Sequence, residues 1–122
     1  MKLVVTENES QALSDAVAGW RHTTCELAVI EVARAAGRAH GARETRARVD
    51  ALFAEIDLIV PTGEVVRRAR EVAPTMLRSL DAIHLATALS LGESLGAFAT
   101  YDRRLADAAR DAGLDVVAPG AR

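Results

Sequence analysis

Three acidic side chains from distant parts of the chain lie in apolar surroundings. Asp81 is the only side chain certain to be charged at neutral pH in the run LDAIHLATALSLG at residues 80–92, Glu31 follows the apolar segment LAVI, and Asp102 comes shortly after AFAT. An ionised carboxylate in such a setting costs several kcal/mol unless a cation or strong hydrogen-bond donors meet it. The three acids therefore predict one shared metal site, because carboxylate oxygens are the ligands that hard divalent cations prefer.

Neighbouring residues leave alternatives open at this site. The helix that contains Asp81 is expected to begin near Ser79, so its carboxylate can instead stabilise the helix N-terminus. His84 lies three residues after Asp81 on the same helical face, so the two side chains could form a metal-binding pair. The favoured interpretation is a neutral histidine that is hydrogen-bonded in or beside the core. Arg34 follows Glu31 by three residues and either lines the mouth of the acid pocket or forms an ion pair with Glu31.

Helix and strand signals alternate along the chain and predict an α/β fold with a parallel sheet and helices on both faces. In such a sheet ligands bind outside the carboxyl ends of the strands, and Asp102 falls there, just after the strand GAFAT. In the first half of the chain we expect a helix from Asn8 or Ser10 to Gly19, a strand starting at 23–28 that leads into a helix ended by Gly41, a helix at 43–55, and a strand at 57–61 ended by Pro61. In the second half we expect a helix at 63–73, the helix of Asp81, a helix at 103–113 ended by Gly113, and a final strand at 114–119.

Composition restricts the classes of function. At 122 residues the chain is expected to form a single domain over residues 1–122. Aromatic residues make up only 3% of it, which nearly excludes stacking platforms for single-stranded bases. A lone cysteine, Cys25, excludes an internal disulfide, and there is neither a secretory signal nor an apolar run that could span a bilayer. We therefore expect a cytoplasmic protein with no membrane contact.

The charge pattern makes any contact with RNA a local one. A formal net charge of −2 gives no overall basic signature of the kind that drives non-specific nucleic-acid binding. Basic residues are nearly all arginines, clustered at residues 34–48, 67–70 and 103–104, and the guanidinium fork suits phosphate. The alternative for any single arginine is a solvated helix face with glutamate partners such as Glu44 and Glu64.

The stretches TTCELAVIEVARA, LRSLDAIHLATAL and FATYDRRLADAARDAG together resemble the PIN-domain ribonucleases, specifically the VapC-type toxins of bacterial toxin–antitoxin pairs. The resemblance runs over essentially the whole chain and implies a PIN-like three-layer α/β/α fold. It implies that Glu31, Asp81 and Asp102 bind Mg2+ or Mn2+, and that Thr100 occupies a hydroxyl position two residues before the last acid. It further implies a metal-dependent endoribonuclease that cuts RNA, is silenced by a cognate antitoxin and forms a homodimer.

The sequence departs from the family pattern at its front. Family members usually open with a short apolar strand that ends in an Asp, whereas here the segment that follows this strand, KLVVTENESQAL, already starts at Lys2, and neither Glu7 nor Glu9 replaces the missing acid. The resemblance therefore implies an N-terminally truncated domain that lacks its central strand, with weakened activity. The alternatives are a catalytically inactive PIN remnant that only binds antitoxin or dimerises, and a phosphate-binding domain on the same fold that is not a nuclease.

Overall fold

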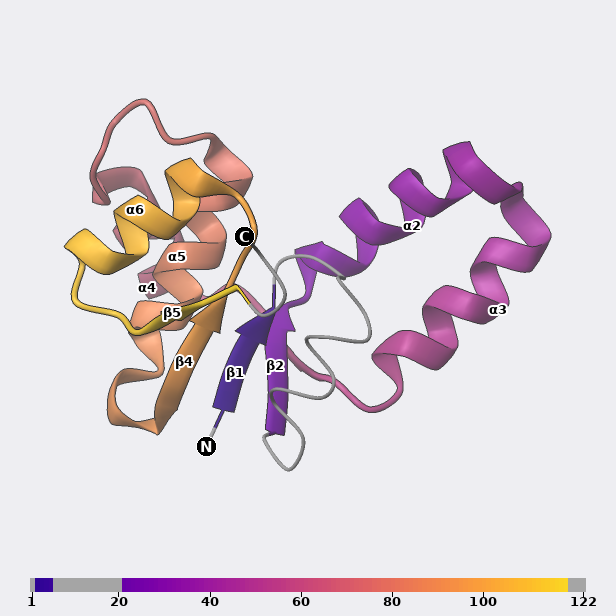
Figure 1. The fold of residues 1–122 in the computed structure, drawn as a ribbon, viewed down its shortest axis with the longest axis horizontal. Coiled ribbons are helices and arrows are strands. Elements are labelled where there is room, and N and C mark those ends of the chain that lie inside the picture. The colour runs from indigo at the N-terminus through magenta and orange to yellow at the C-terminus, as the bar shows by residue number, and fades with distance from the viewer. Residues whose placement is uncertain (1, 6–20, 119–122) are drawn as a thin grey trace.

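The computed structural model describes residues 2–5 and 21–118 (Figure 1). Strands and helices alternate in it, as the sequence predicts. The elements are β1 (Lys2–Val5), β2 (Arg21–Cys25), α2 (Leu27–His40), α3 (Ala42–Phe53), β3 (Asp57–Ile59), α4 (Gly63–Glu71), α5 (Ser79–Ser90), a 3-10 turn η1 (Gly92–Ser94), β4 (Leu95–Ala99), α6 (Arg103–Asp111) and β5 (Val116–Val117).

The strands form one five-stranded sheet in the order β3-β2-β1-β4-β5, and every neighbouring pair is parallel. The prediction of an α/β fold with a parallel sheet is therefore confirmed. Parallel strands bring their carboxyl ends to one edge of the sheet, and the segments that follow β2 and β4 start from that edge. The predicted helix of residues 8–19, which was expected to supply one of the covering layers, lies outside the described residues.

The predicted absence of a central strand is wrong for this structure. Lys2–Val5 itself forms β1 at the centre of the sheet, where Leu3 is in register with His22 of β2 and with Ala97 of β4. The physical reason is that β2 and β4 would otherwise each carry a row of unpaired backbone groups, and the apolar residues Leu3, Val4 and Val5, two of them β-branched, are compatible with a central strand. The strand contains no acidic residue, so the sheet is complete while the acid expected at this strand's end is absent from Lys2–Val5.

Helix boundaries follow the local signals. Gly41 and Gly113 have φ angles of 84° and 93°, the left-handed region that ends a helix at little cost only for glycine, and they follow α2 and the last turn of α6 as predicted. Thr62 caps α4, because its side-chain oxygen accepts a hydrogen bond from the Val65 N–H at 3.3 Å. No described helix is long and apolar enough to cross a membrane.

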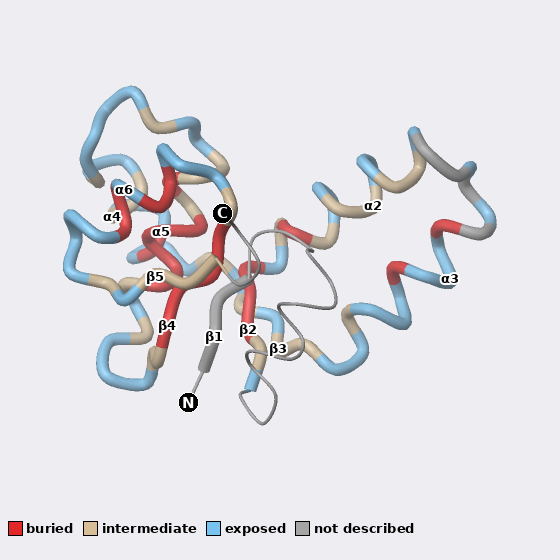
Figure 2. The backbone as a smooth tube through the Cα atoms, viewed as in Figure 1, coloured by how far each residue is buried: buried red, intermediate tan, exposed pale blue. Residues whose placement is uncertain are grey.

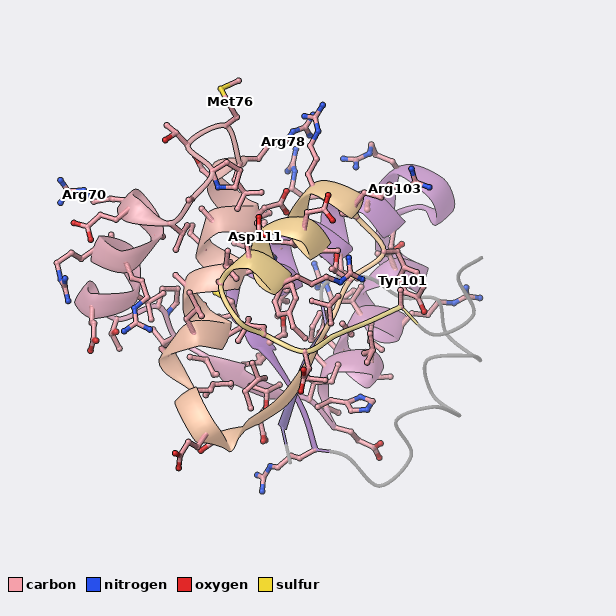
Figure 3. The ribbon with its side chains drawn as sticks, turned by 60° about the vertical axis from the view of Figure 1, so that its left-hand side comes forward. Arg70, Met76, Arg78, Tyr101, Arg103 and Asp111 are labelled. Atoms are coloured by element: carbon pink, nitrogen blue, oxygen red, sulfur yellow. The ribbon has the colours of Figure 1, made fainter. Side chains whose placement is uncertain are left out.

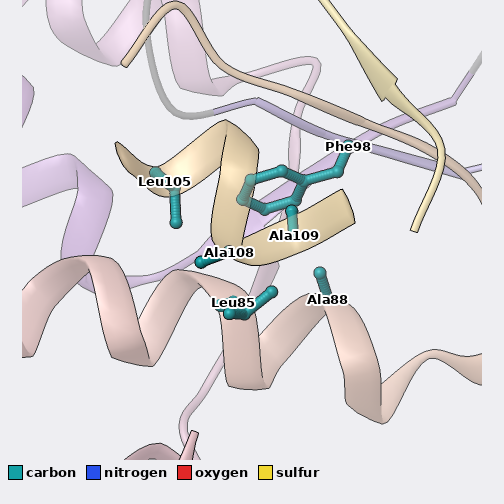
Figure 4. Packing of buried hydrophobic residues seen from close by; sticks show 6 residues of the cluster. All are labelled: Leu85, Ala88, Phe98, Leu105, Ala108 and Ala109. Atoms are coloured by element: carbon teal, nitrogen blue, oxygen red, sulfur yellow. The ribbon is translucent and has the colours of Figure 1, made fainter. Parts of the chain in front are cut away.

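The core is built from small and branched side chains between α5, α6 and β4. Its centre is a fully or almost fully buried cluster of six residues, namely Leu85, Ala88, Phe98, Leu105, Ala108 and Ala109 (Figure 4). The alanines let the two helices approach the sheet closely, and Phe98 fills the remaining space, so this aromatic side chain serves packing as predicted. Cys25 is also fully buried, as expected for a small apolar side chain.

The helices α2 and α3 form a hairpin that projects from the sheet. Figure 1 shows them as an antiparallel pair on the opposite side from α4, α5 and α6, and Figure 2 shows that α3 is mostly exposed whereas β4 and α5 are mostly buried. The contacts of α2 with other helices are mainly with α3. The described molecule therefore has a well-packed body and a more loosely attached helical arm.

Candidate metal and active site

The three predicted acids lie around one cavity of about 660 Å³. Glu31 is on the second turn of α2, Asp81 is in the first turn of α5, and Asp102 is the N-cap residue of α6. Residues separated by up to 71 positions in sequence are brought together because the helices that carry them start near the same edge of the parallel sheet. The structure thus brings the three acids to one cavity, and their role as one shared metal site stays a prediction.

Arginines and apolar side chains complete the walls of this cavity. Arg78 precedes α5 as its N-cap residue, and Arg103 and Arg104 open α6. None of the three forms an ion pair with another described residue. Figure 3 shows Arg78 and Arg103 projecting at the same end of the molecule. The remaining lining residues are Met76, Leu77, Leu80, His84 and Leu105.

The surroundings of Asp81 disfavour the charged form of its carboxyl group. Its side chain is half-buried, and burial is the largest cause that raises the pKa of its carboxyl group, followed by the negative charge of Asp102. Glu31 raises that pKa further, whereas His84 and Arg78 act in the opposite direction. No hydrogen bond from a residue within 2–5 or 21–118 reaches this carboxylate, so neither a cap nor an ion pair compensates its charge there. Asp81 does lie in the first turn of α5, so the alternative that the helix N-terminus stabilises its carboxylate stays open.

Asp102 and Thr100 together shape the turn that follows β4. The Asp102 side chain accepts a hydrogen bond from the Leu105 N–H at 3.0 Å, which caps α6, and its own N–H donates to the Thr100 hydroxyl oxygen at 3.2 Å. Thr100 is buried and is not among the residues that line the cavity. Its observed contact therefore positions the Asp102 backbone, and the direct catalytic role that the resemblance implied stays a prediction.

The cap at Asp102 leads to a prediction about stability. Replacing Asp102 by Ala should lower the free energy of unfolding by about 1 kcal/mol, because the first turn of α6 loses its side-chain acceptor. Replacing it by Asn should cost much less, because an asparagine oxygen caps a helix about as well as a carboxylate. Urea unfolding followed by circular dichroism measures both. Equal losses in the two variants would contradict the capping role.

His84 connects Glu31 to the core. It is 1% exposed, and its Nε2 lies 3.4 Å from Oε1 of Glu31, which agrees with the favoured interpretation of a histidine hydrogen-bonded beside the core. Arg34 is exposed and does not line the cavity, so the described partner of Glu31 is His84 and not the arginine one turn away. Sequence reasoning missed this pairing because the two residues are 53 positions apart.

The donor set suits a hard divalent cation. Within the described part of the chain no group of three His, Cys, Asp or Glu side chains is compact enough to hold a metal ion by itself. Mg2+, however, is commonly bound through one or two carboxylates together with waters and phosphate oxygens. Asp81 and Asp102 line the same cavity, and the pKa of Asp81 is raised first by burial and then by the negative charge of Asp102, both of which a bound cation would offset. The residues present therefore fit a Mg2+ or Mn2+ ion.

Comparisons with known proteins point the same way. A family model described as PIN domain matches residues 2–111. Ribonuclease VapC46 of Mycobacterium tuberculosis is 42% identical over 122 residues, covering 98% of this chain and 91% of that protein. Ribonuclease VapC47 from the same species is 34% identical with the same coverage.

A solved structure shows the same fold despite low identity. The chain in the structure of VapBC-1 from nontypeable Haemophilus influenzae has a TM-score of 0.72 at 14% identity, covering 95% of this chain and 96% of that one. At this identity the likeness concerns the fold alone. It agrees with a PIN-like arrangement of parallel strands and helices.

Proposed function

The chain belongs to the PIN-domain family as a VapC-type member, and on this premise we propose that it is a metal-dependent endoribonuclease toxin of a toxin–antitoxin system. The observation that carries the proposal is Asp81, a half-buried carboxylate that faces a cavity with two further acids and receives no hydrogen bond from a described residue. A site that leaves an anion uncompensated in this way is suited to a cationic ligand. The names of the relatives supply the reaction class, since VapC46 and VapC47 are called ribonucleases.

Each group has a defined part in this proposal. Asp81 and Asp102 hold the cation, and Glu31 on α2 adds a third negative charge to the cavity. A bound Mg2+ or Mn2+ supplies positive charge to the phosphodiester and lowers the pKa of the attacking water. Arg78, Arg103 and Arg104 contact the RNA phosphates, because they line the same cavity and form no ion pair with a described residue. These arginines give a local basic surface on a chain of net charge −2.

We infer that the activity is weaker than that of a PIN site with a full set of acids. The strand β1 carries no carboxylate at Lys2–Val5, and loss of a metal ligand is expected to cost at least about 10- to 100-fold in affinity or activity. A catalytically inactive remnant remains the second candidate. It is favoured by the lack, among described residues, of a compact three-ligand metal group.

We also propose a cognate antitoxin as the protein partner. The structural neighbour from H. influenzae is a VapBC protein, and a cavity with three acids would accept a basic side chain from a bound antitoxin in place of the cation. The homodimer that the resemblance implied stays a prediction.

Metal-linked stability tests the proposal directly. Adding Mn2+ or Mg2+ to the purified chain should raise its melting temperature, because a ligand that binds only the folded state stabilises it by about 2.7 kcal/mol at a free concentration 100 times its Kd. NaCl at matched ionic strength serves as the control. RNA cleavage should require the same cations and stop in EDTA.

The two candidates predict different results in this experiment. A melting temperature that responds equally to Mn2+ and NaCl, together with intact RNA, would reject the nuclease in favour of the inactive remnant. Cleavage that continues in EDTA would contradict the metal-dependent mechanism while leaving a ribonuclease in place.

A further inference from the structure

Glu31 differs from the other two acids in the part of the molecule that carries it. Asp81 and Asp102 sit at the starts of α5 and α6, whose helices pack into the main core through Leu85, Leu105 and their neighbours. Glu31 lies on α2, the first helix of the projecting arm, and its side chain is 41% exposed. A carboxylate on a loosely attached arm needs a specific contact to stay oriented toward the other two acids.

His84 makes that contact from a position where a polar side chain is costly. It is 1% exposed and its helical neighbours Leu85 and Ala88 are fully buried, so a leucine at this position would fill similar space without the cost of removing an imidazole from water. A carboxylate can only accept hydrogen bonds, so the nitrogen that faces Glu31, Nε2, must carry the proton and donate it. The other nitrogen, Nδ1, is buried and has no partner among the described residues.

We propose that His84 is a positioning residue whose Nε2–H group fixes the Glu31 carboxylate toward Asp81 and Asp102. This inference rests on the proposed function. It explains why a histidine is buried at this position: its contact with Glu31 joins α5 of the packed body to α2 of the arm and orients one proposed metal ligand. Without it the Glu31 side chain is free to turn into solvent. A partner that orients a metal ligand typically accounts for about 10- to 100-fold in metal affinity.

Two polar substitutions separate positioning from packing. In His84→Gln the side-chain amide reaches the place of Nε2 and can still donate to Glu31, whereas in His84→Asn the amide stops at the place of Nδ1. Both variants bury an amide in the same helix, so they share the cost to folding. We expect H84Q to bind Mn2+ with nearly the affinity of the wild type and H84N to bind it about 10- to 100-fold more weakly. Electron paramagnetic resonance of free Mn2+ measures both, and thermal unfolding without metal checks the fold.

A third variant links the effect to its target. Glu31→Gln removes the charge that His84 orients, so H84N should reduce Mn2+ affinity much less in the E31Q background than in the wild type, as expected for two groups that act as a unit. Equal Mn2+ affinities for the wild type, H84Q and H84N would overturn the positioning role alone. A wild type that does not bind Mn2+ would overturn the proposed function and, with it, this inference. If H84N fails to fold, His84→Leu, which fills similar space without a donor, takes its place. Mn2+ affinity equal to that of the wild type would then overturn the inference, and a loss of about 10- to 100-fold that shrinks in the E31Q background would support it.

Discussion

Replacing Asp81 by Asn is expected to lower metal-dependent RNA cleavage by at least about 100-fold while making the metal-free protein more stable. The loss follows because Asp81 lines the cavity together with Asp102 and Glu31, and its carboxylate receives no hydrogen bond from a described residue. The gain follows because burial and both neighbouring acids disfavour the ionised form. Asparagine keeps the shape and removes the charge. Opposite changes in activity and stability at one residue are typical of a site that stores electrostatic strain for ligand binding.

The stability gain has a defined pH dependence. Folding raises the pKa of Asp81 above its value in the unfolded chain, so the folded state favours the protonated carboxyl group. The stabilisation from Asp81 is therefore fully present at pH values below the unfolded-state pKa, and it is lost as the pH rises through the higher pKa of the folded state. The asparagine side chain of D81N cannot ionise, so without metal the wild type should lose stability relative to this variant over that acidic range. Added Mn2+ should reverse the order at neutral pH, because only the wild type keeps the Asp81 carboxylate as a proposed metal ligand.

Asp50→Asn is the matched control, because Asp50 is an exposed acid on α3 outside the cavity. It makes the same chemical change and should leave cleavage and Mn2+-linked stability unchanged. Gel-based RNA cleavage and urea unfolding at a series of pH values measure the two effects. Persistent cleavage in D81N would show that the reaction uses another site.

Local sequence is sufficient to locate the acids, because their surroundings carry the signal. Asp81 stands in an otherwise apolar helix and Asp102 follows a buried strand, and each pattern is readable over about ten residues. The α/β alternation then places both at the carboxyl edge of a parallel sheet without any knowledge of tertiary contacts. Helix ends at Gly41 and Gly113 are predictable for the same reason, because a positive φ is a local requirement.

Contacts between residues that are distant in sequence cannot be predicted from such local patterns. Nothing near His84 indicates that its partner is Glu31, 53 residues earlier, since the pairing depends on how the arm meets the body. Likewise KLVV is too short to distinguish a strand from the start of a helix, and comparison with the family pattern assigns it to the segment after the first strand. Its place between β2 and β4 is decided by the backbone groups of those two strands, which are distant in sequence.

Replacing Val4 by Pro is expected to destabilise the fold by about 3 kcal/mol or more, because β1 is paired on both sides. Val4 is in register with Thr23 of β2 and with Phe98 of β4. In a strand with two neighbours each backbone N–H is used, so proline leaves a buried carbonyl acceptor without its donor and adds a steric clash in the sheet. Against a total of about 5 to 15 kcal/mol, such a loss is large. The urea midpoint and slope measure it.

Val60→Pro is the control for this experiment, because Val60 is 60% exposed and follows the edge strand β3. The same substitution there should change the free energy of unfolding by no more than about 0.5 kcal/mol. If V4P and V60P have equal urea midpoints, Lys2–Val5 contributes nothing to the stability of the sheet. That result would support the interpretation that this segment follows a missing strand. A large loss in V4P alone would establish that Lys2–Val5 completes the sheet as its central strand. Because this strand contains no acidic residue, it completes the fold without adding a carboxylate to the site, and this is the physical basis for the weakened activity inferred above.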